Sequence, residues 1–185
     1  EDRSAIGLAT SDDRGITWTR LPDPVLERGN AGTWDDDRVG QPSVLFDAAS
    51  QTWHLWYRGS DGSVENIGHA TSVDGLSWDR HLDSSGSTAP VWDGSGAIFA
   101  DTTTGVQVRA TDGGFQMWFD ATLEDTVRIG RAESPDGIRL VLQALEEGDK
   151  REGVSGEAAV GEAADLVGAA VLVDGLGDAS RVQVD

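Results

Sequence analysis

The sequence lacks cysteine, has only 14 basic residues against 33 acidic ones, and contains no long hydrophobic run. Without cysteine there are no disulfides and no thiolate metal sites, and the redox compartment stays open. The formal net charge of −19 repels phosphate backbones, so nucleic acid is not an expected partner, and anionic membrane surfaces are disfavoured for the same reason. No apolar segment reaches the roughly 20 residues needed to cross a bilayer. The 185 residues are enough for one acidic domain with a core.

The two ends of the chain also lack familiar features. The first residue is not Met, and no signal peptide is recognisable, which is typical of a mature form or a fragment. All twelve aromatic residues lie at or before Phe119. We therefore expect the packed core to lie in the earlier part of the chain.

Internal repetition is the strongest pattern that is present. Glycine is abundant, at 24 residues, and many of these glycines fall in Asp-Gly or Gly-Ser pairs, which are typical of tight turns between short strands. Three segments resemble one another, with their isoleucines 61 and 62 residues apart: AIGLATSDDRGITW from Ala5, NIGHATSVDGLSW from Asn66 and RIGRAESPDGIRL from Arg128. A second motif, WHLWYRG from Trp53 and FQMWFDA from Phe115, keeps the period of 62. Two motifs on one period indicate a repeat architecture.

Each repeat is expected to hold about four antiparallel strands. WHLWYR alternates between two faces, PSVLFD (42–47) is typical of a strand buried on both faces, and IGHATS leads through a Ser-x-Asp-Gly turn into a fourth strand. Such units must stack on their neighbours, and around an axis they form a β-propeller of roughly 4–8 blades. The sequence therefore predicts an all-β propeller with about three visible blades in residues 1–140. We expect it to be part of a larger propeller, with a self-closed three-bladed ring as the alternative.

Residues 141–185 form the least patterned part of the chain. VGAAVLVDG from Val167 resembles VGQPSVLFD from Val39, whereas EGVSGEAAVGEAADLVG is compatible with a helix or with poor order. We interpret 141–185 as a degenerate or incomplete blade.

The repeated motifs resemble those of known propellers. Ser11, Asp13, Gly15, Thr17 and Trp18 match Ser-x-Asp-x-Gly-x-Thr-Trp, which resembles the Asp-box of sialidases. The shorter SVDGLSW and SPDGIRL, with IGHATS, PSVLFD and WHLWYRG, are more similar to the five-bladed glycoside hydrolases of families 43, 32 and 130. The resemblance covers residues 1 to about 140. It implies an oligo- or polysaccharide partner and an extracellular or periplasmic location.

This resemblance also implies chemistry by two carboxyl groups. One protonates the leaving oxygen and the other activates water, roughly 6.5–9.5 Å apart in inverting enzymes and about 5–5.5 Å apart in retaining ones. The families often carry Asp before the Pro of the inner strand, where this chain has Gln41, which is neither acid nor base. In the next repeat Asp101 lies two residues before the expected equivalent of Gln41. The families' general acid is a Glu, and Glu157 in SGEAAV is the nearest candidate.

The aspartates of the repeated turn are interpreted as structural. A catalytic residue acts once, whereas Asp13, Asp74 and Asp136 recur in the same place, with Asp12 beside the first of them. Asp accepts backbone N–H bonds in such turns, and Gly supplies the positive φ. Trp18 and Trp78 of the same motif are then expected to pack between blades.

Further candidates lie where the repeat does not dictate the residue. Asp35, Asp36 and Asp37 lead into an inner strand and either open on the central funnel or form a solvated loop. Arg58 aligns with Asp120, so neither belongs to the common scaffold. The three histidines, at 54, 69 and 81, have spacings that fit no local zinc motif, and no calcium loop is present, so we expect no metal and no other cofactor.

The sequence thus predicts a carbohydrate-active propeller that resembles glycoside hydrolases. The candidate catalytic residues are Asp36, Asp37, Asp101 and Glu157, and the candidate substrate-binding residues are Trp34, Gln41, His54, Arg58, Trp92 and Asp120. Packing between blades is the alternative role of the two tryptophans and the histidine. The alternative function is a non-catalytic propeller that binds glycans or proteins, or a fragment without activity, and Gln41 favours it.

Overall fold

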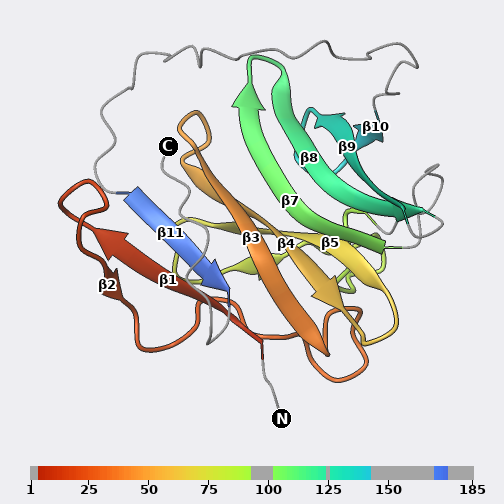
Figure 1. The fold of residues 1–185 in the computed structure, drawn as a ribbon, viewed down its shortest axis with the longest axis horizontal. Coiled ribbons are helices and arrows are strands. Elements are labelled where there is room, and N and C mark those ends of the chain that lie inside the picture. The colour runs from red at the N-terminus through yellow and green to blue at the C-terminus, as the bar shows by residue number, and fades with distance from the viewer. Residues whose placement is uncertain (1–3, 93–101, 124–125, 143–168, 175–185) are drawn as a thin grey trace.

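A computed structural model of the chain describes residues 4–92, 102–123, 126–142 and 169–174. These residues form strands and turns, with no helix among them, and in the same ranges no helix is long and apolar enough to cross a membrane. The strands build three antiparallel sheets, which we call the first, second and third blades (Figure 1). The all-β propeller with about three blades is therefore confirmed.

The second and third blades have the same four-stranded order along the chain. The second contains β3 (Arg38–Asp47), β4 (Thr52–Ser60), β5 (Glu65–Ser72) and β6 (Asp79–Arg80). The third contains β7 (Thr102–Thr111), β8 (Gly114–Leu123), β9 (Thr126–Ser134) and β10 (Val141–Leu142). In each of these blades the first strand along the chain is the inner strand, β3 or β7. These two inner strands lie beside each other (Figure 1).

The first blade joins strands from both ends of the described chain. Its order is β11-β1-β2, with β1 at Ile6–Ser11, β2 at Thr19–Arg20 and β11 at Ala169–Asp174. β11 pairs with β1 from Ile6↔Asp174 to Ser11↔Ala169, as β4 pairs with β5 from Arg58↔Ile67 to Trp53↔Ser72. It therefore takes the second position of a blade, although its sequence resembled that of an inner strand. Residues 143–168 and 175–185, with the stretch considered for a helix, lie outside the described residues.

The repeated Ile-Gly pair shows why the same residues recur in each blade. Ile67 lies between the second and third blades, almost without solvent exposure. The next residue, Gly68, faces the other way, and a Cβ there would stand 2.5 Å from Cζ of Tyr57. At Gly130 the same Cβ would stand 2.4 Å from Cζ of Phe119. The glycines thus leave room for the aromatic ring of the neighbouring strand, and Ile6 and Ile67 fill the contacts between blades.

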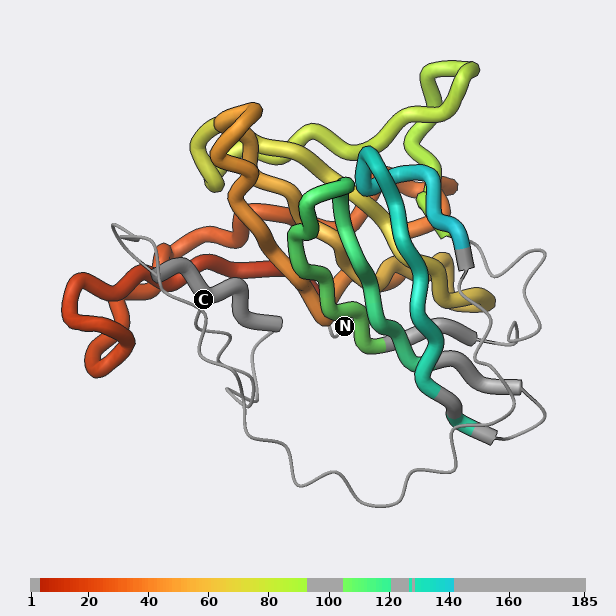
Figure 2. Tube along the Cα trace, turned by 90° about the horizontal axis from the view of Figure 1, so that it is seen from above, coloured from red at the N-terminus to blue at the C-terminus, as the bar shows by residue number. Residues whose placement is uncertain are grey.

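Two apolar cores join the three blades in series. The first and second blades share the core of Ile6, Leu26, Val39, Leu55, Tyr57 and Ala70. The second and third blades share the core of Trp56, Ile67, Val106, Val108, Met117, Phe119 and Ala132. Each blade is too thin to enclose a core, so burial occurs only between blades. Seen from above, the blades follow one another side by side (Figure 2).

The repeated aspartates close the outer turns, as the repeat predicted. Asp74 Oδ1 accepts the N–H groups of Leu76 (2.8 Å) and Ser77 (2.9 Å). Asp13 accepts the hydroxyl of Thr17 at 2.6 Å and its N–H at 2.8 Å, and these bonds, followed by the bond from Ser11, lower the pKa of Asp13 to about 2. Asp136 accepts the N–H groups of residues 138 and 139 in the same way. These carboxylates hold turns and lie in the outer loops of the blades.

Candidate functional site

The inner strands of the second and third blades carry matching bulges. Gln41 has φ 49° and lies where the pairing of β3 with β4 shifts between Gly40 and Ser43. Gly105 has φ 58° and lies where the pairing of β7 with β8 shifts between Thr104 and Val106. Gly40 pairs with Arg58, and Thr104 pairs with Asp120, which is the residue equivalent to Arg58 in the third blade. Each bulge begins at the next residue, so Gly105 is the structural equivalent of Gln41.

This register corrects one expectation from the sequence. Asp101 stands four residues before the equivalent of Gln41, where two residues were expected, because the inner strands are offset by 64 residues and the other strands by about 62. The third blade therefore has glycine at the position that corresponds to Gln41. Asp101 itself lies outside the described residues, as does Glu157.

Side chains of β3 satisfy the backbone of the inner strand beside it. Gln41 Oε1 accepts the N–H of Gly105 at 2.7 Å, and Ser43 Oγ accepts the N–H of Val108 at 3.0 Å. An edge strand otherwise leaves such N–H groups unpaired. Gln41 thus ties the second blade to the third at the point where both inner strands begin.

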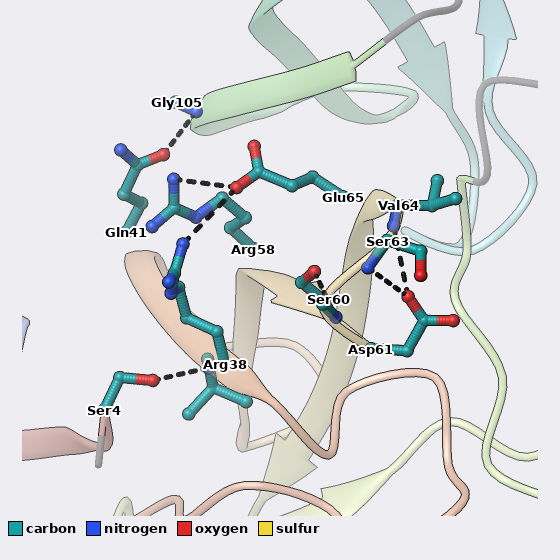
Figure 3. A network of polar contacts seen from close by, with 12 residues as sticks. Ser4, Arg38, Gln41, Arg58, Ser60, Asp61, Ser63, Val64, Glu65 and Gly105 are labelled. Carbon is teal, nitrogen blue, oxygen red and sulfur yellow. Dashed lines mark hydrogen bonds and ion pairs between the residues drawn. The ribbon is translucent and has the colours of Figure 1, made fainter. Parts of the chain in front are cut away.

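A group of charged and polar residues surrounds this point (Figure 3). Figure 3 shows four of its members, Arg38, Gln41, Arg58 and Glu65, and we add Asp120 of the third blade because its carboxylate lies against Gly105. We call these five residues the strand-start cluster. Glu65 Oε1 lies 3.3 Å from Nη1 of Arg58 and 3.9 Å from Nη1 of Arg38. The side chains of Arg58 and Glu65 are about one-fifth exposed, so they are held by the fold and still reach solvent.

Asp120 enters the cluster from the third blade. Its carboxylate lies against the α-carbon of Gly105, so that a Cβ at Gly105 would stand 2.5 Å from Asp120 Oδ2. Gln41 and Asp120 therefore both contact Gly105, one through the backbone N–H and the other at the α-carbon. A residue larger than glycine at position 105 would displace the carboxylate.

One register position carries opposite charges in the second and third blades. The isoleucine of the repeated motif pairs with Arg58 in the second blade and with Asp120 in the third. In the first blade Ile6 pairs with Asp174. The three positions lie at the same end of their sheets, which in the second and third blades is the end where the inner strands begin. This end therefore carries side chains that the repeat does not require for packing.

The cluster can recognise a ligand with hydroxyl or carboxyl groups. Arg58 Nε is buried and has no hydrogen-bond partner among the described residues. Guanidinium groups donate in a fixed fork, and carboxylates accept from hydroxyl groups. Donors from Arg58 and acceptors from Glu65 and Asp120 are thus available at one end of the sheets.

The acidic loop before β3 divides into buried and exposed parts. Asp35 is fully buried, and its Oδ2 accepts from Arg80 Nε at 2.9 Å and from the Tyr57 hydroxyl at 3.0 Å. This residue therefore holds the loop. Asp36 accepts the N–H of Gly32 at 2.6 Å, and the exposed Asp37 donates its N–H to the carbonyl of residue 60 at 3.0 Å. Asp37 immediately precedes the cluster.

The two candidate tryptophans pack on aromatic neighbours. Trp34 stacks on Tyr57, with ring centroids 5.7 Å apart. Trp92 lies 5.7 Å from the ring of Phe119, and its backbone bridges to Ile67. Both indoles are partly exposed. These contacts match the packing alternative for both residues.

His54 lies four residues before Arg58 on β4, about 13 Å along the strand. Its Nδ1 is 3.0 Å from Nε2 of His69, and its ring centroid is 5.1 Å from that of Phe115 in the third blade. Burial lowers the pKa of His54. The structure places this residue at the contact between blades and away from the strand-start cluster.

Sequence reasoning found three members of the cluster and missed two. Gln41, Arg58 and Asp120 were identified, whereas Arg38 and Glu65 were not. Each missed residue is the first residue of a strand and bears a charge. The next repeat does not keep the charge of Glu65, since Val127 occupies the same position there. The signal that pointed to Arg58 would have found Glu65 as well.

No protein-family model and no curated protein sequence matches the chain. Solved structures resemble its fold. A family 117 glycoside hydrolase produced by the marine bacterium Zobellia galactanivorans matches with a TM-score of 0.61 and 19% identity, over 75% of this chain and 40% of that one. A glycosyl hydrolase from Bacteroides ovatus matches with a TM-score of 0.51 and 16% identity, over 59% and 32%.

A third match comes from work on the family 130 mannoside phosphorylases, which contain glycoside hydrolases that target β-1,2 mannosidic linkages in Candida mannan. Its TM-score is 0.51 at 15% identity, over 60% of this chain and 32% of that one. The chain spans 32% to 40% of the length of these three proteins. At such identities the likeness shows the fold alone, a propeller architecture that this chain shares with these proteins.

Proposed function

We propose that this chain is a carbohydrate-binding propeller of the glycoside hydrolase kind and that the strand-start cluster holds the sugar. The observation that carries the proposal is the exchange of Arg58 for Asp120 at one register position, beside two equivalent bulges. Because two blades carry opposite charges at this position, the packing of the blades does not require either side chain. The likeness in fold to glycoside hydrolases supports carbohydrate as the class of ligand.

The chemistry of the cluster suits sugar hydroxyl groups. Arg58 offers donors, including an Nε without a partner among the described residues, and Asp120 offers acceptors. Hydrogen bonds to charged groups contribute about 1.5–3 kcal/mol each. Gln41 already uses its Oε1 to join two blades, so we assign it to positioning the site.

The test is binding of arabinan, fructan and mannan oligosaccharides, measured by titration calorimetry. Arg58→Gln and Asp120→Asn are each expected to weaken binding about tenfold or more, since each removes a charged hydrogen bond. Arg139→Gln is the matched control, because Arg139 is 85% exposed in an outer turn. Equal affinity of the Arg58→Gln variant and the unmodified protein would refute the assignment.

Hydrolysis of the glycosidic bond is the second candidate function. It is favoured by the carboxylates of Asp120 and Glu65 at one end of the sheets, because the reaction needs two carboxyl groups. Asp36, Asp37, Asp101 and Glu157 remain candidates for one of the two. Release of nitrophenol from 4-nitrophenyl glycosides tests this function. Turnover that is lost in Asp120→Asn and kept in Arg139→Gln would support it, and binding without turnover would contradict it.

A further inference from the structure

The strand-start cluster holds more positive than negative charge around Glu65. Arg38 and Arg58 lie on the neighbouring strands β3 and β4, and both face Oε1 of Glu65 (Figure 3). Within the described residues, Glu65 is the only ion-pair partner of either guanidinium group, and Asp120 pairs with neither. Two positive charges therefore meet one negative charge, in a chain whose formal net charge is −19.

Arg58 and Arg80 are equally buried but differ in their hydrogen bonds. Each side chain is 19% exposed. Arg80 donates from Nε to Asp35 at 2.9 Å and from Nη2 to the carbonyl of residue 27, so the fold holds its guanidinium group. Arg58 donates no hydrogen bond to any described residue, and its buried Nε lacks a partner there. Because polar groups with so little exposure nearly always have partners, Arg58 is better suited to holding a bound molecule than to holding the fold.

Arg38 adds a second guanidinium group with open donors. Its side chain is 50% exposed, and its Nη1 lies 3.9 Å from Oε1 of Glu65, which is too far for a hydrogen bond. Its guanidinium group donates no hydrogen bond to the other residues that the structure describes. The donors of Arg38 and Arg58 thus face one place at the end of the sheets, and solvent reaches both side chains.

A carboxylate fits these donors better than a hydroxyl group does. Carboxylate oxygens accept parallel N–H bonds from the planar fork of a guanidinium group, and these bonds are roughly twice as strong as neutral ones. A carboxylate also neutralises the excess positive charge, which a hydroxyl group leaves in place. The negative charge elsewhere on the chain opposes an anion only weakly, because charges more than about 8 Å away are largely screened at physiological ionic strength.

We propose that the sugar held by the strand-start cluster is a uronic acid. Arg58 and Arg38 bind its carboxylate, and Asp120 accepts hydrogen bonds from its hydroxyl groups. The inference rests on the proposed sugar site and names the class of sugar that this site takes. The second blade thus recognises the charge and the third blade recognises the hydroxyl groups, where Gln41 joins the two blades by accepting the N–H of Gly105.

The test is titration calorimetry of the full chain with the trisaccharides of galacturonic, glucuronic and mannuronic acid, each compared with its own methyl ester. Esterification removes the charge and keeps the hydroxyl groups. At least one uronate should bind about tenfold or more tightly than its ester, because charged hydrogen bonds are lost in the ester. Arg58→Gln should remove this preference, and Arg38→Gln should lower it about threefold, since Arg38 is half exposed. Arg139→Gln, in an outer turn, is the matched control and should leave the preference unchanged.

The outcomes separate this inference from the proposed function. Equal affinity for every uronate and its ester, with binding still weakened by Arg58→Gln, would overturn the uronic acid and leave the sugar site in place. A preference for uronate that neither Arg58→Gln nor Arg38→Gln changes would overturn both, as would the absence of binding to these trisaccharides and to the neutral oligosaccharides. An equal loss in Arg139→Gln would show an effect of overall charge and would also overturn the inference. Unchanged urea midpoints of the Arg38→Gln variant exclude unfolding as the cause, because Arg38 donates no hydrogen bond to the described fold.

Discussion

Acidification should weaken the contact between the second and third blades through His69. This residue is 3% exposed, and its Nε2 lies 3.0 Å from Nδ1 of His54, so that one neutral ring accepts from the other. Burial, followed by the charges of His54 and His81, lowers the pKa of His69 to about 3, against the opposing effect of Asp136. The folded state therefore keeps His69 neutral at mildly acidic pH.

The magnitude follows from the two protonation states. In the unfolded chain the pKa of histidine is about 6.5, so above this pH both states are neutral and His69 has no effect on pH dependence. Below it only the unfolded state takes up the proton, and the free energy of unfolding falls by about 1.4 kcal/mol per pH unit until the folded state titrates near pH 3. Between about pH 7.5 and pH 5 the loss amounts to about 2 kcal/mol.

Urea unfolding of the protein and of His69→Leu, followed from about pH 7.5 to pH 5, measures this loss. Leucine is the matched replacement, because Leu8 occupies the same register position in the first blade. The variant should gain about 2 kcal/mol relative to the unmodified protein over this range, whereas titrating groups that do not contact His69 cancel in the difference. A difference that stays constant within about 0.5 kcal/mol would refute the reasoning.

Three further outcomes are expected. Gly68→Ala should destabilise the fold by about 1–3 kcal/mol in urea, because its Cβ would overlap Tyr57, whereas Gly113→Ala, with open space around it, should be tolerated; equal effects would contradict the packing account. Asp35→Asn should cost about 3 kcal/mol, because it leaves a partly buried arginine unpaired, and a loss below about 1 kcal/mol would be inconsistent with the buried ion pair. The carboxyl carbon of Asp13 should titrate near pH 2 by NMR, and a midpoint near its ordinary value of 3.8 would disprove the turn bonds.

Much of the fold was predictable because the packing rule is local and repeated. The Ile-Gly pair, the alternating WHLWYR segment and the Ser-x-Asp-Gly turn each impose the same strand or turn wherever they occur. Arg58 and Asp120 were found because they break the pattern. Bulges escaped this reasoning, since Gln41 and Gly105 share a backbone conformation and a register but no residue type.

The amino-acid sequence by itself determined the strands, their alternating faces, the number of visible blades and the structural role of the repeated aspartates. These properties depend on neighbours within one repeat. Only the tertiary structure decided that β11 pairs with β1, that Asp35 is neutralised by Arg80 and that Gln41 joins the inner strands. Those contacts link residues from 45 to 168 positions apart, and no local pattern specifies which distant edge or charge will meet. The same distinction explains why Ile67 and Ile129, alike in sequence, differ so widely in exposure.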